Sequence, residues 1–430
     1  MYQLKQLPTA PLKILLCGLN FSPEAVGIGR YSGELARWLS SRGFDVHAIT
    51  APPYYPQWRV QRPARNRYSR ERFGTLKIDR CPIWVPRQPG GLTRLLHLAS
   101  FCSSSLPLVL SRLVAPPDCI IVIAPAFFST LPALLLAQAC RLRGRPIATL
   151  LHIQDFELDA AFELGLLRGG WIRQLAERLE TKLLRSFDRV STISEAMSAR
   201  LIEKGVLPDR VVLFPNWVDA SSIKVAPAPA QLGWRQELGI PSNALVLLYS
   251  GSMNQKQGLE LLAAAAHRLA DQRELWWIFC GEGPTANQLQ QACAGLSQVI
   301  FLPLQSKESF SDLLQLADIH LLPQKQGAAD LVMPSKLLGI LASARPVIAT
   351  ADPSSALGQA VLEPQPAGLV TPPGDLSTFI AAVQELARDA ELRRQLGSVA
   401  RLRVEQRWDR EAVLLRFEQQ LLSINRRSCP

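Results

Sequence analysis

The sequence lacks several patterns that would place it in well-known classes of protein. Its eight cysteines include no C-x-x-C pair, and several lie in apolar runs where cysteine behaves as a small hydrophobic residue. The stretch Met1–Leu12 shows no basic segment followed by an apolar core, so no signal peptide is predicted. No apolar run reaches the roughly 20 residues needed to span a bilayer, because charged residues and prolines interrupt the longest stretches. We therefore expect a reduced, cytoplasmic protein.

Acidic residues are also few relative to basic ones. The chain has 36 Asp and Glu against 47 Lys and Arg, a net charge of +11, which suits an anionic partner. Part of the excess lies in one stretch that contains Arg59, Arg62, Arg65, Arg67, Arg70, Arg72, Lys77 and Arg80. This stretch is either a solvated loop or a surface for phospholipid headgroups or a lipid-linked diphosphate. No groove-reading motif accompanies it, so no nucleic-acid partner is expected.

A second segment also leaves two readings open. Residues 93–114 mix Arg94, His97 and Arg112 with many leucines. The segment is either an ordinary core helix or an amphipathic helix that lies against the anionic inner face of the cytoplasmic membrane.

The order of elements predicts two α/β lobes with parallel sheets covered by helices on both faces. Strand-like runs alternate with helical patterns such as 31–41, 171–186 and 194–205. The expected strands are 13–18, 44–50, 119–124, 146–152, 189–193 and 211–214, then 245–250, 275–280, 298–301, 319–322, 346–349 and 368–370. A Pro- and Ala-rich stretch separates the two series. We expect a first domain over 1–218, a linker over 219–242, a second domain over 243–405 and a closing helix within 406–430.

Open α/β sheets bind ligands beyond the carboxyl ends of their strands, so the loops after the strands are the informative segments. The first strand is followed by a loop with Gly27 and Gly29 just before a helix. These glycines would let backbone amides approach a ligand, although a helix-starting turn needs no ligand. The G-x-G-x-x-G order of a dinucleotide site is absent.

Three loops of the second lobe have the composition of a diphosphate site. Gly251, Ser252 and Lys256 form a glycine turn with a lysine, and no Walker order is present. Glu282 and Gly283 follow the next strand, where glycine again allows close approach. A third loop leads into Ser335, Lys336 and Leu337, with Ser335 expected as the N-cap of a helix whose amides face phosphate oxygens. Each loop alone could be structural, but three in one lobe favour binding.

His152 ends a strand and is followed by the polar residues Gln154, Asp155, Glu157 and Asp159. A lone histidine is more often structural than functional. Its position at the carboxyl end of a strand favours a site residue.

The combination of these motifs resembles the exopolysaccharide glycosyltransferases of the colanic acid (WcaI) type. The matching runs are 18–24, 27–31, 51–58, 151–155, 215–219, 249–253, 256–260 and 333–337, which together span nearly the whole chain. The resemblance implies family 4 of the retaining glycosyltransferases and the α/β GT-B fold. That fold has two Rossmann-like, doubly wound domains facing an interdomain cleft, with the donor mostly on the second domain and the acceptor on the first.

The resemblance also implies roles for individual residues. Lys256 would face the donor diphosphate, His152 the donor sugar, and Gly27 to Gly29 the diphosphate from the other domain. The partners would be a nucleotide-sugar donor and a glycan or polyprenyl-diphosphate-linked acceptor, with no cofactor and no metal. Two family features are absent. Ser252 replaces an arginine, and the glutamate pair E-x7-E falls on Leu331 and Gly339, so Asp330 would stand in for the first glutamate.

The expected chemistry is the departure of a nucleoside diphosphate, whose developing negative charge Lys256 and the helix start at Ser335 would stabilise. Replacing Lys256 or His152 by alanine is expected to impair transfer. Two alternatives remain open. A nucleotide-sugar epimerase on the same scaffold would isomerise the donor alone, and a catalytically silent glycosyltransferase-like subunit would bind nucleotide without transfer.

Overall fold

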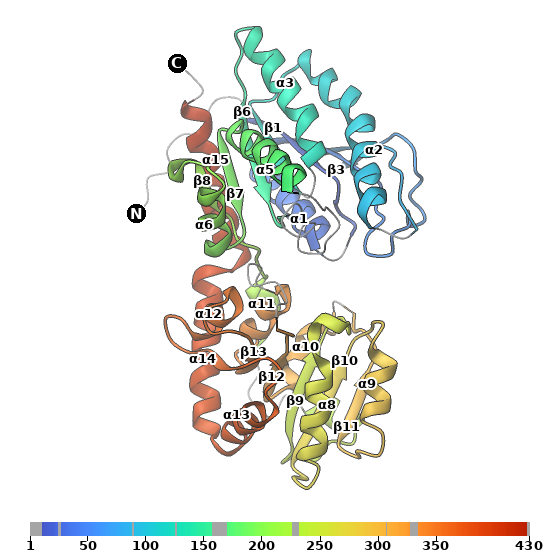
Figure 1. The fold of residues 1–430 in the computed structure, drawn as a ribbon, viewed down its shortest axis with the longest axis vertical. Coiled ribbons are helices and arrows are strands. Elements are labelled where there is room, and N and C mark those ends of the chain that lie inside the picture. The colour runs from blue at the N-terminus through green and yellow to red at the C-terminus, as the bar shows by residue number, and fades with distance from the viewer. Residues whose placement is uncertain are drawn as a thin grey trace. The chain divides into compact units, whose positions relative to one another are not determined.

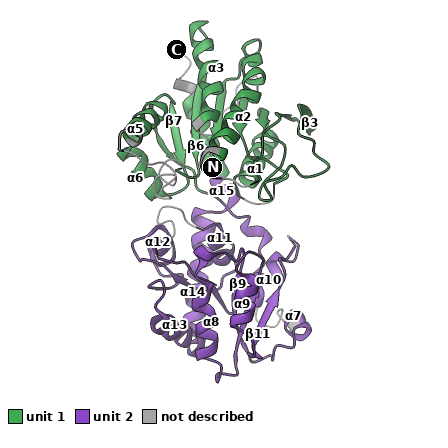
Figure 2. Ribbon diagram, turned by 45° about the vertical axis from the view of Figure 1, so that its right-hand side comes forward, with its two compact units in different colours: residues 1–215, 414–430 green, residues 216–413 purple. Residues whose placement is uncertain are grey.

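The computed structural model describes residues 11–24, 27–87, 90–124, 127–156, 170–225, 232–306, 308–326 and 334–427. The chain forms two compact units, which are coloured separately in Figure 2. Unit 1 comprises Met1–Pro215 and Leu414–Pro430, and unit 2 comprises Asn216–Val413. No helix in the described ranges combines the length and apolar character needed to cross a bilayer.

Unit 1 contains an eight-stranded sheet in the order β3-β4-β2-β1-β5-β6-β7-β8. The strands are β1 Lys13–Gly18, β2 Asp45–Thr50, β3 Ser69–Phe73, β4 Leu76–Arg80, β5 Cys119–Ile123, β6 Ala148–Ile153, β7 Arg189–Thr192 and β8 Val211–Leu213. All neighbouring strands pair in parallel except β3 with β4. Every residue of β5 and β6 is buried, as expected for central parallel strands covered on both faces.

The helices of unit 1 lie against the sheet, and most of them connect its strands (Figure 1). They are α1 Gly27–Ser41, α2 Gly91–Leu110, α3 Thr130–Leu142, α5 Gly170–Arg185, α6 Glu195–Glu203 and the second part of α15 Arg410–Arg427, with short 3-10 turns at Ser111–Leu113, Phe127–Ser129 and Pro208–Arg210. The α2 helix buries His97, Leu98 and Phe101, while Leu95 and Leu96 are exposed. Phe417 of α15 stacks on Phe214 with the ring centroids 3.8 Å apart.

The basic stretch is not simply a loop, because residues 69–80 include a β-hairpin. Strand β3 pairs antiparallel with β4, and β4 continues the sheet beside β2. Asp79 of β4 is buried and accepts hydrogen bonds from Arg70 Nε at 2.9 Å and Arg112 at 3.0 Å. Arg80 pairs with Glu71 across the hairpin. For residues 69–80, the interpretation as a solvated loop was wrong, because it rested on the density of basic residues and left out the acidic residues that pair with them.

Unit 2 contains a six-stranded, fully parallel sheet in the order β11-β10-β9-β12-β13-β14. The strands are β9 Leu245–Ser250, β10 Leu275–Cys280, β11 Val299–Leu302, β12 Ile319–Leu322, β13 Val347–Thr350 and β14 Gly368–Thr371. The helices are α7 Leu232–Glu237, α8 Leu259–Arg268, α9 Ala286–Ala292, α10 Phe310–Leu316, α11 Ser335–Ala342, α12 Ala356–Leu362, α13 Leu376–Arg388 and α14 Ala390–Arg407, with 3-10 turns at Ala220–Ser222 and Gln255–Gln257. Clusters of buried apolar residues cover its sheet. Two doubly wound α/β units are thus confirmed.

Residues at the start of the expected linker pack into unit 2. Val218, Ala220 and Ile223 belong to a buried cluster with residues of α11 and α14. Val218 also forms a parallel bridge with Asp409, and its amide donates to the carbonyl of Trp408 at 3.0 Å. The chain therefore leaves unit 1 after Pro215 and returns to it at Leu414.

Each sheet has a switch point, where the strand order runs outward in both directions from one strand. In unit 1 the chain moves from β1 to β2 on one side and later to β5 on the other. In unit 2 the chain moves from β9 to β10 on one side and later to β12 on the other. Loops at such a point diverge and leave a crevice at the carboxyl ends of the strands, where open α/β sheets bind ligands.

Candidate functional site

Two of the loops predicted in unit 2 meet through Lys336, near the start of α11. Its ammonium donates to Tyr249 Oη at 2.9 Å and to Gln257 Oε1 at 3.0 Å. Tyr249 lies near the end of β9, and Gln257 lies in the glycine turn that follows. The Tyr249 hydroxyl in turn donates to the carbonyl of Ser252 at 2.6 Å. Lys336 therefore joins the turn after β9 to the helix that starts after β12, at the switch point of this sheet.

Gly251 leaves the space through which the Lys336 side chain passes. A Cβ atom on Gly251 would lie 2.4 Å from Lys336 Cε, and the φ of +130° at Gly251 is one that other residues rarely adopt. Gly281 and Gly283 bring the next loop equally close, since their Cβ atoms would meet the carbonyl oxygens of Gly251 and Met253 at 2.0 and 2.1 Å. The three loops predicted to converge are thus in direct contact.

The Lys336 ammonium is held mainly by uncharged groups. Burial lowers the pKa of Lys336 from 10.5 to about 8. Its hydrogen-bond partners in the described part of the chain are a phenol and an amide, and it lies 4.7 Å from the centroid of the Tyr249 ring. Folding has therefore already removed much of its water, while the residue remains partly exposed. Such a cation is suited to an anionic ligand.

Lys256, the cation favoured from the sequence, lies in the turn after β9, and its environment differs from that of Lys336. Its side chain is exposed, and its backbone amide donates to Asn254 Oδ1 at 3.1 Å. The neighbouring Gln257, not Lys256, contacts Lys336. Ser252 is also exposed, and its hydroxyl accepts from Asn254 Nδ2 at 2.9 Å.

Ser335 is not the N-cap of α11, which corrects the prediction from sequence. The helix begins with Ser335 itself, and Pro334 occupies the cap position without a side-chain hydrogen bond. Proline at this position holds the extended backbone that precedes a helix but supplies no capping oxygen. Ser335 is exposed, whereas Leu337 is fully buried beneath the turn. Asp330 lies outside the described residues.

A hollow of about 450 Å³ lies beside these loops in unit 2. Its lining includes Met253, Glu282, Gly283, Phe301 and Pro303. Glu282 is exposed, and its carbonyl accepts from the Met253 amide at 2.8 Å. Two of the predicted binding residues, Glu282 and Gly283, thus line a space that a ligand group can enter.

In unit 1, the glycine loop after β1 is held by Glu24, whose role the sequence did not indicate. The buried Glu24 carboxylate accepts from the amides of Tyr54 and Tyr55 at 3.1 and 3.0 Å, and from Asn20 Nδ2 at 3.0 Å. Burial raises the pKa of Glu24, and these hydrogen bonds oppose the shift. A Cβ atom on Gly29 would lie 2.3 Å from a Glu24 oxygen, so Gly29 is required by this packing.

Gly27 differs from Gly29 in what surrounds it. It has a φ of +60°, and among the described residues a Cβ atom there would meet only the ring of Tyr55, at 3.8 Å. The loops after β1 and β2 therefore lie against each other at the carboxyl edge of the sheet. Gly27 is therefore less crowded than Gly29, which serves the packing of its own loop.

His152 lies near the end of β6, as predicted, but it is buried and fully engaged. Its Nδ1 is 3.0 Å from Ser191 Oγ, and its Nε2 is 3.3 Å from Gln154 Nε2. Burial lowers the pKa of His152 to about 3, so the imidazole is neutral at physiological pH. A neutral ring can position a ligand or accept a hydrogen bond, but it carries no charge for a phosphate.

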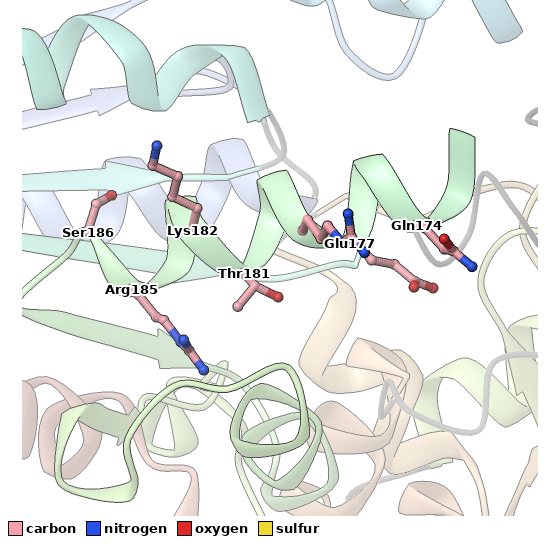
Figure 3. Close-up of a pocket in the computed structure, with 7 residues that line it drawn as sticks. Gln174, Glu177, Thr181, Lys182, Arg185 and Ser186 are labelled. Atoms are coloured by element: carbon pink, nitrogen blue, oxygen red, sulfur yellow. The ribbon is translucent and has the colours of Figure 1, made fainter. Parts of the chain in front are cut away.

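A further hollow of about 520 Å³ runs along one face of α5 in unit 1 (Figure 3). Gln174, Glu177, Thr181 and Arg185 line it, together with other residues of the same helix. None of the residues predicted for the site contributes to it. We therefore place the candidate ligand site of unit 2 at the three loops around Lys336.

Comparison with known proteins agrees with the division of the chain into two α/β units. Residues 26–217 match the model of the glycosyl transferase 4-like domain, and residues 244–389 match that of the glycosyl transferases group 1. The chain is 40% identical over 413 residues to the Escherichia coli (strain K12) protein that carries the name colanic acid biosynthesis glycosyl transferase WcaI, covering 94% of this chain and 98% of that protein. It is 26% identical to a Pseudomonas aeruginosa protein named as glycosyltransferase WbjE, covering 67% and 72% of the two chains.

Solved structures show the same architecture at low sequence identity. Sucrose-phosphate synthase from Thermosynechococcus elongatus has a TM-score of 0.71 at 18% identity, covering 96% of this chain and 99% of that one. Anabaena HepE in complex with UDP and glucose has a TM-score of 0.64 at 17% identity, covering 96% and 100%. Together with the relative that is 40% identical over almost its whole length, they show that this chain belongs to the family 4-like glycosyltransferases and has the GT-B fold.

Proposed function

We propose that this glycosyltransferase moves a sugar from a nucleoside-diphosphate sugar, GDP- or UDP-linked, to a glycan or polyprenyl-diphosphate-linked acceptor in cell-surface polysaccharide synthesis. The observation that carries the proposal is the partly exposed Lys336 ammonium, held by neutral groups at the switch point of unit 2. Folding has already removed part of the water around this ammonium, so less remains to be removed when a ligand binds. A diphosphate would supply the anionic partner that the described residues around it lack.

The donor is proposed to lie along the three loops of unit 2. Its phosphates would contact Lys336 and the amides of the turn at Gly251 and Ser252, with Lys256 as a second, outer cation. The nucleobase would enter the hollow beside Glu282 and Gly283, which adjoins the same turn. The complex of HepE with UDP and glucose, a protein of the same fold, supports a nucleotide-sugar donor.

The chemistry proposed is departure of the nucleoside diphosphate with retention of configuration at the sugar. Negative charge gathers on the leaving phosphate, and a cation already in place stabilises it more than the ground state. We propose that Lys336, Lys256 and the amides at the start of α11 supply this stabilisation without a metal or cofactor, and that Asp330 takes the place of a family glutamate. Neutral His152 would position the sugar.

The acceptor is proposed to bind unit 1, with peripheral contact to an anionic membrane. Arg62, Arg65 and Arg67 are exposed next to the β3–β4 hairpin, where Phe73 and Tyr68 are 65% and 52% exposed. Exposed basic side chains beside aromatic ones suit a surface of anionic headgroups. A polyprenyl-linked acceptor would be presented at that surface.

The first test is a thermal-shift panel with UDP, GDP, their sugars, and the matching phosphate-free nucleosides. A ligand that binds only the folded state raises the melting temperature. At a ligand concentration of 100 times the dissociation constant, it adds about 2.7 kcal/mol to the free energy of unfolding. We expect one of the two diphosphate series to raise the melting temperature and its nucleoside to have little effect. Equal shifts with nucleoside and diphosphate, or no shift at all, would refute a diphosphate-binding site.

Replacing His152 by alanine is expected to lower transfer at least about tenfold while nucleoside-diphosphate affinity stays near that of the wild type. The imidazole is neutral and lies in unit 1, so it should act on the sugar and not on the phosphates. Initial rates and calorimetric affinities measured on the same samples separate the two effects. Ser191→Ala removes only the Nδ1 partner and serves as the control for local packing. Transfer by His152→Ala at the wild-type rate would make His152 structural.

A further inference from the structure

An aromatic cluster in unit 1 surrounds Trp58, in the loop after β2. The Trp58 ring is half-buried, and Tyr55 beside it is 39% exposed, with their centroids 6.4 Å apart. Behind them, the buried Tyr54 contacts Trp58 edge-on and the buried His97 contacts it at a tilt, with ring centroids 5.7 and 5.3 Å from that of Trp58. The Tyr54 hydroxyl lies 3.0 Å from His97 Nε2, and His97 Nδ1 lies 2.6 Å from the Trp84 carbonyl. The buried pair thus fixes the orientation of the exposed rings.

The backbone of Trp58 is held in an unusual conformation. Its φ is +51°, in the left-handed region that large side chains rarely adopt. Such a conformation costs roughly 1 to 3 kcal/mol and persists only where the surroundings impose it, which is common at ligand sites. Here the turn is closed by the Arg59 amide, which donates to the Tyr54 carbonyl at 3.1 Å.

Polar groups adjoin the exposed rings. The Arg94 guanidinium lies over the Trp58 ring, 5.1 Å from its centroid. Partial desolvation raises the pKa of Asp155, and the positive charge of Arg94 opposes that shift. Asp155 follows β6 three residues after His152, and Tyr55 adjoins Gly27. The cluster therefore lies at the carboxyl edge of the sheet in unit 1, among the loops predicted to carry the site.

We propose that Tyr55, Trp58, Arg94 and Asp155 form the subsite that receives a neutral pyranose ring of the acceptor. This proposal rests on the proposed transferase function and assigns its acceptor chemistry. A pyranose has an apolar face of C–H groups and a rim of hydroxyls. The fixed indole and phenol rings provide the apolar surface, and the guanidinium and carboxylate provide a donor and an acceptor for the hydroxyls.

The test uses methyl α-D-glucopyranoside and methyl α-D-galactopyranoside as probes, with the nucleoside diphosphate that stabilises the protein also present. Saturation-transfer NMR reports the dissociation constant of each pyranoside and which of its protons touch the protein. Trp58→Gly removes the ring, and glycine adopts the φ of this position without strain. Leu95→Ala, at the residue that follows Arg94 in α2, is a control, because Leu95 is 42% exposed and outside the subsite.

We expect Trp58→Gly to weaken binding of one pyranoside roughly tenfold, equivalent to about 1.4 kcal/mol, with nucleotide affinity unchanged. Trp58→Phe should keep most of the binding, and Leu95→Ala all of it. Pyranoside binding that is absent in the wild type, or unchanged in Trp58→Gly, would overturn the subsite. Pyranoside binding without any nucleotide binding would instead overturn the proposed function and leave the subsite standing.

Discussion

Replacing Lys336 by methionine is expected to weaken UDP or GDP binding about 100-fold and to lower transfer by at least as much. A lysine about 4 Å from a phosphate oxygen, at an effective dielectric near 20, interacts by roughly 4 kcal/mol before desolvation. Much of the desolvation of Lys336 has already occurred on folding, as its pKa of about 8 indicates. About 2.7 kcal/mol of the interaction should therefore remain, which corresponds to 100-fold in affinity. Isothermal titration calorimetry measures it.

The matched control is Lys256→Met, in the turn after β9 whose Gln257 contacts Lys336. The Lys256 ammonium is exposed, so water and salt screen its interaction with a phosphate. We expect less than about tenfold loss of affinity from this change. Methionine keeps the length and apolar stem of lysine, so the folded state should survive in both variants. Affinity of Lys336→Met within threefold of the wild type, or a larger loss in Lys256→Met, would contradict the assignment.

Replacing Gly251 by alanine is expected to weaken nucleotide binding at least about tenfold by displacing Lys336. The added methyl group would lie 2.4 Å from Lys336 Cε, at a φ of +130° that alanine adopts only with strain. The effect should largely disappear when Lys336 is already methionine, because the two changes act on one contact. Calorimetric affinities of the four proteins form the double-mutant cycle.

Gly295→Ala separates this effect from backbone strain alone. Gly295 is also in unit 2 and has a φ of +85°, but no atom of the described residues outside its chain neighbours lies within 4 Å of a Cβ atom built there. We expect Gly295→Ala to lower the melting temperature without changing nucleotide affinity. Independent, additive losses from Gly251→Ala and Lys336→Met would show that the glycine acts through the backbone of its own turn.

The central strands were predictable because their physics is local. Runs such as Leu245–Ser250 and Leu275–Cys280 are almost wholly apolar and end in turn residues, and the structure confirms these bounds. Strand β3 could not be recognised in this way, because all five of its residues are exposed. It exists only through pairing with β4, whose buried Asp79 depends on Arg112 from a distant segment.

The contact between the three loops of unit 2 could be predicted from the sequence, but the atoms that make it could not. The glycine turns and the start of α11 could be recognised because ligand-binding loops follow strands. The choice of Lys336 over Lys256 depends on the contact between β9 and α11. The contacting residues, Tyr249 and Lys336, are 87 residues apart in the sequence. The positive φ of Trp58 and the contact between Glu24 and Gly29 are likewise set by tertiary packing.

The pH dependence of nucleotide affinity tests the central claim, that the Lys336 ammonium binds the donor phosphates. Free Lys336 has a pKa of about 8, so it is charged below that pH and loses its proton above it. Binding of UDP or GDP to the wild type, measured from about pH 6.5 to 9.5, should therefore weaken as the pH rises through about 8, with proton uptake on binding. Lys336→Met should bind weakly and show no such decline. The same decline in both proteins, or none in the wild type, would contradict the account.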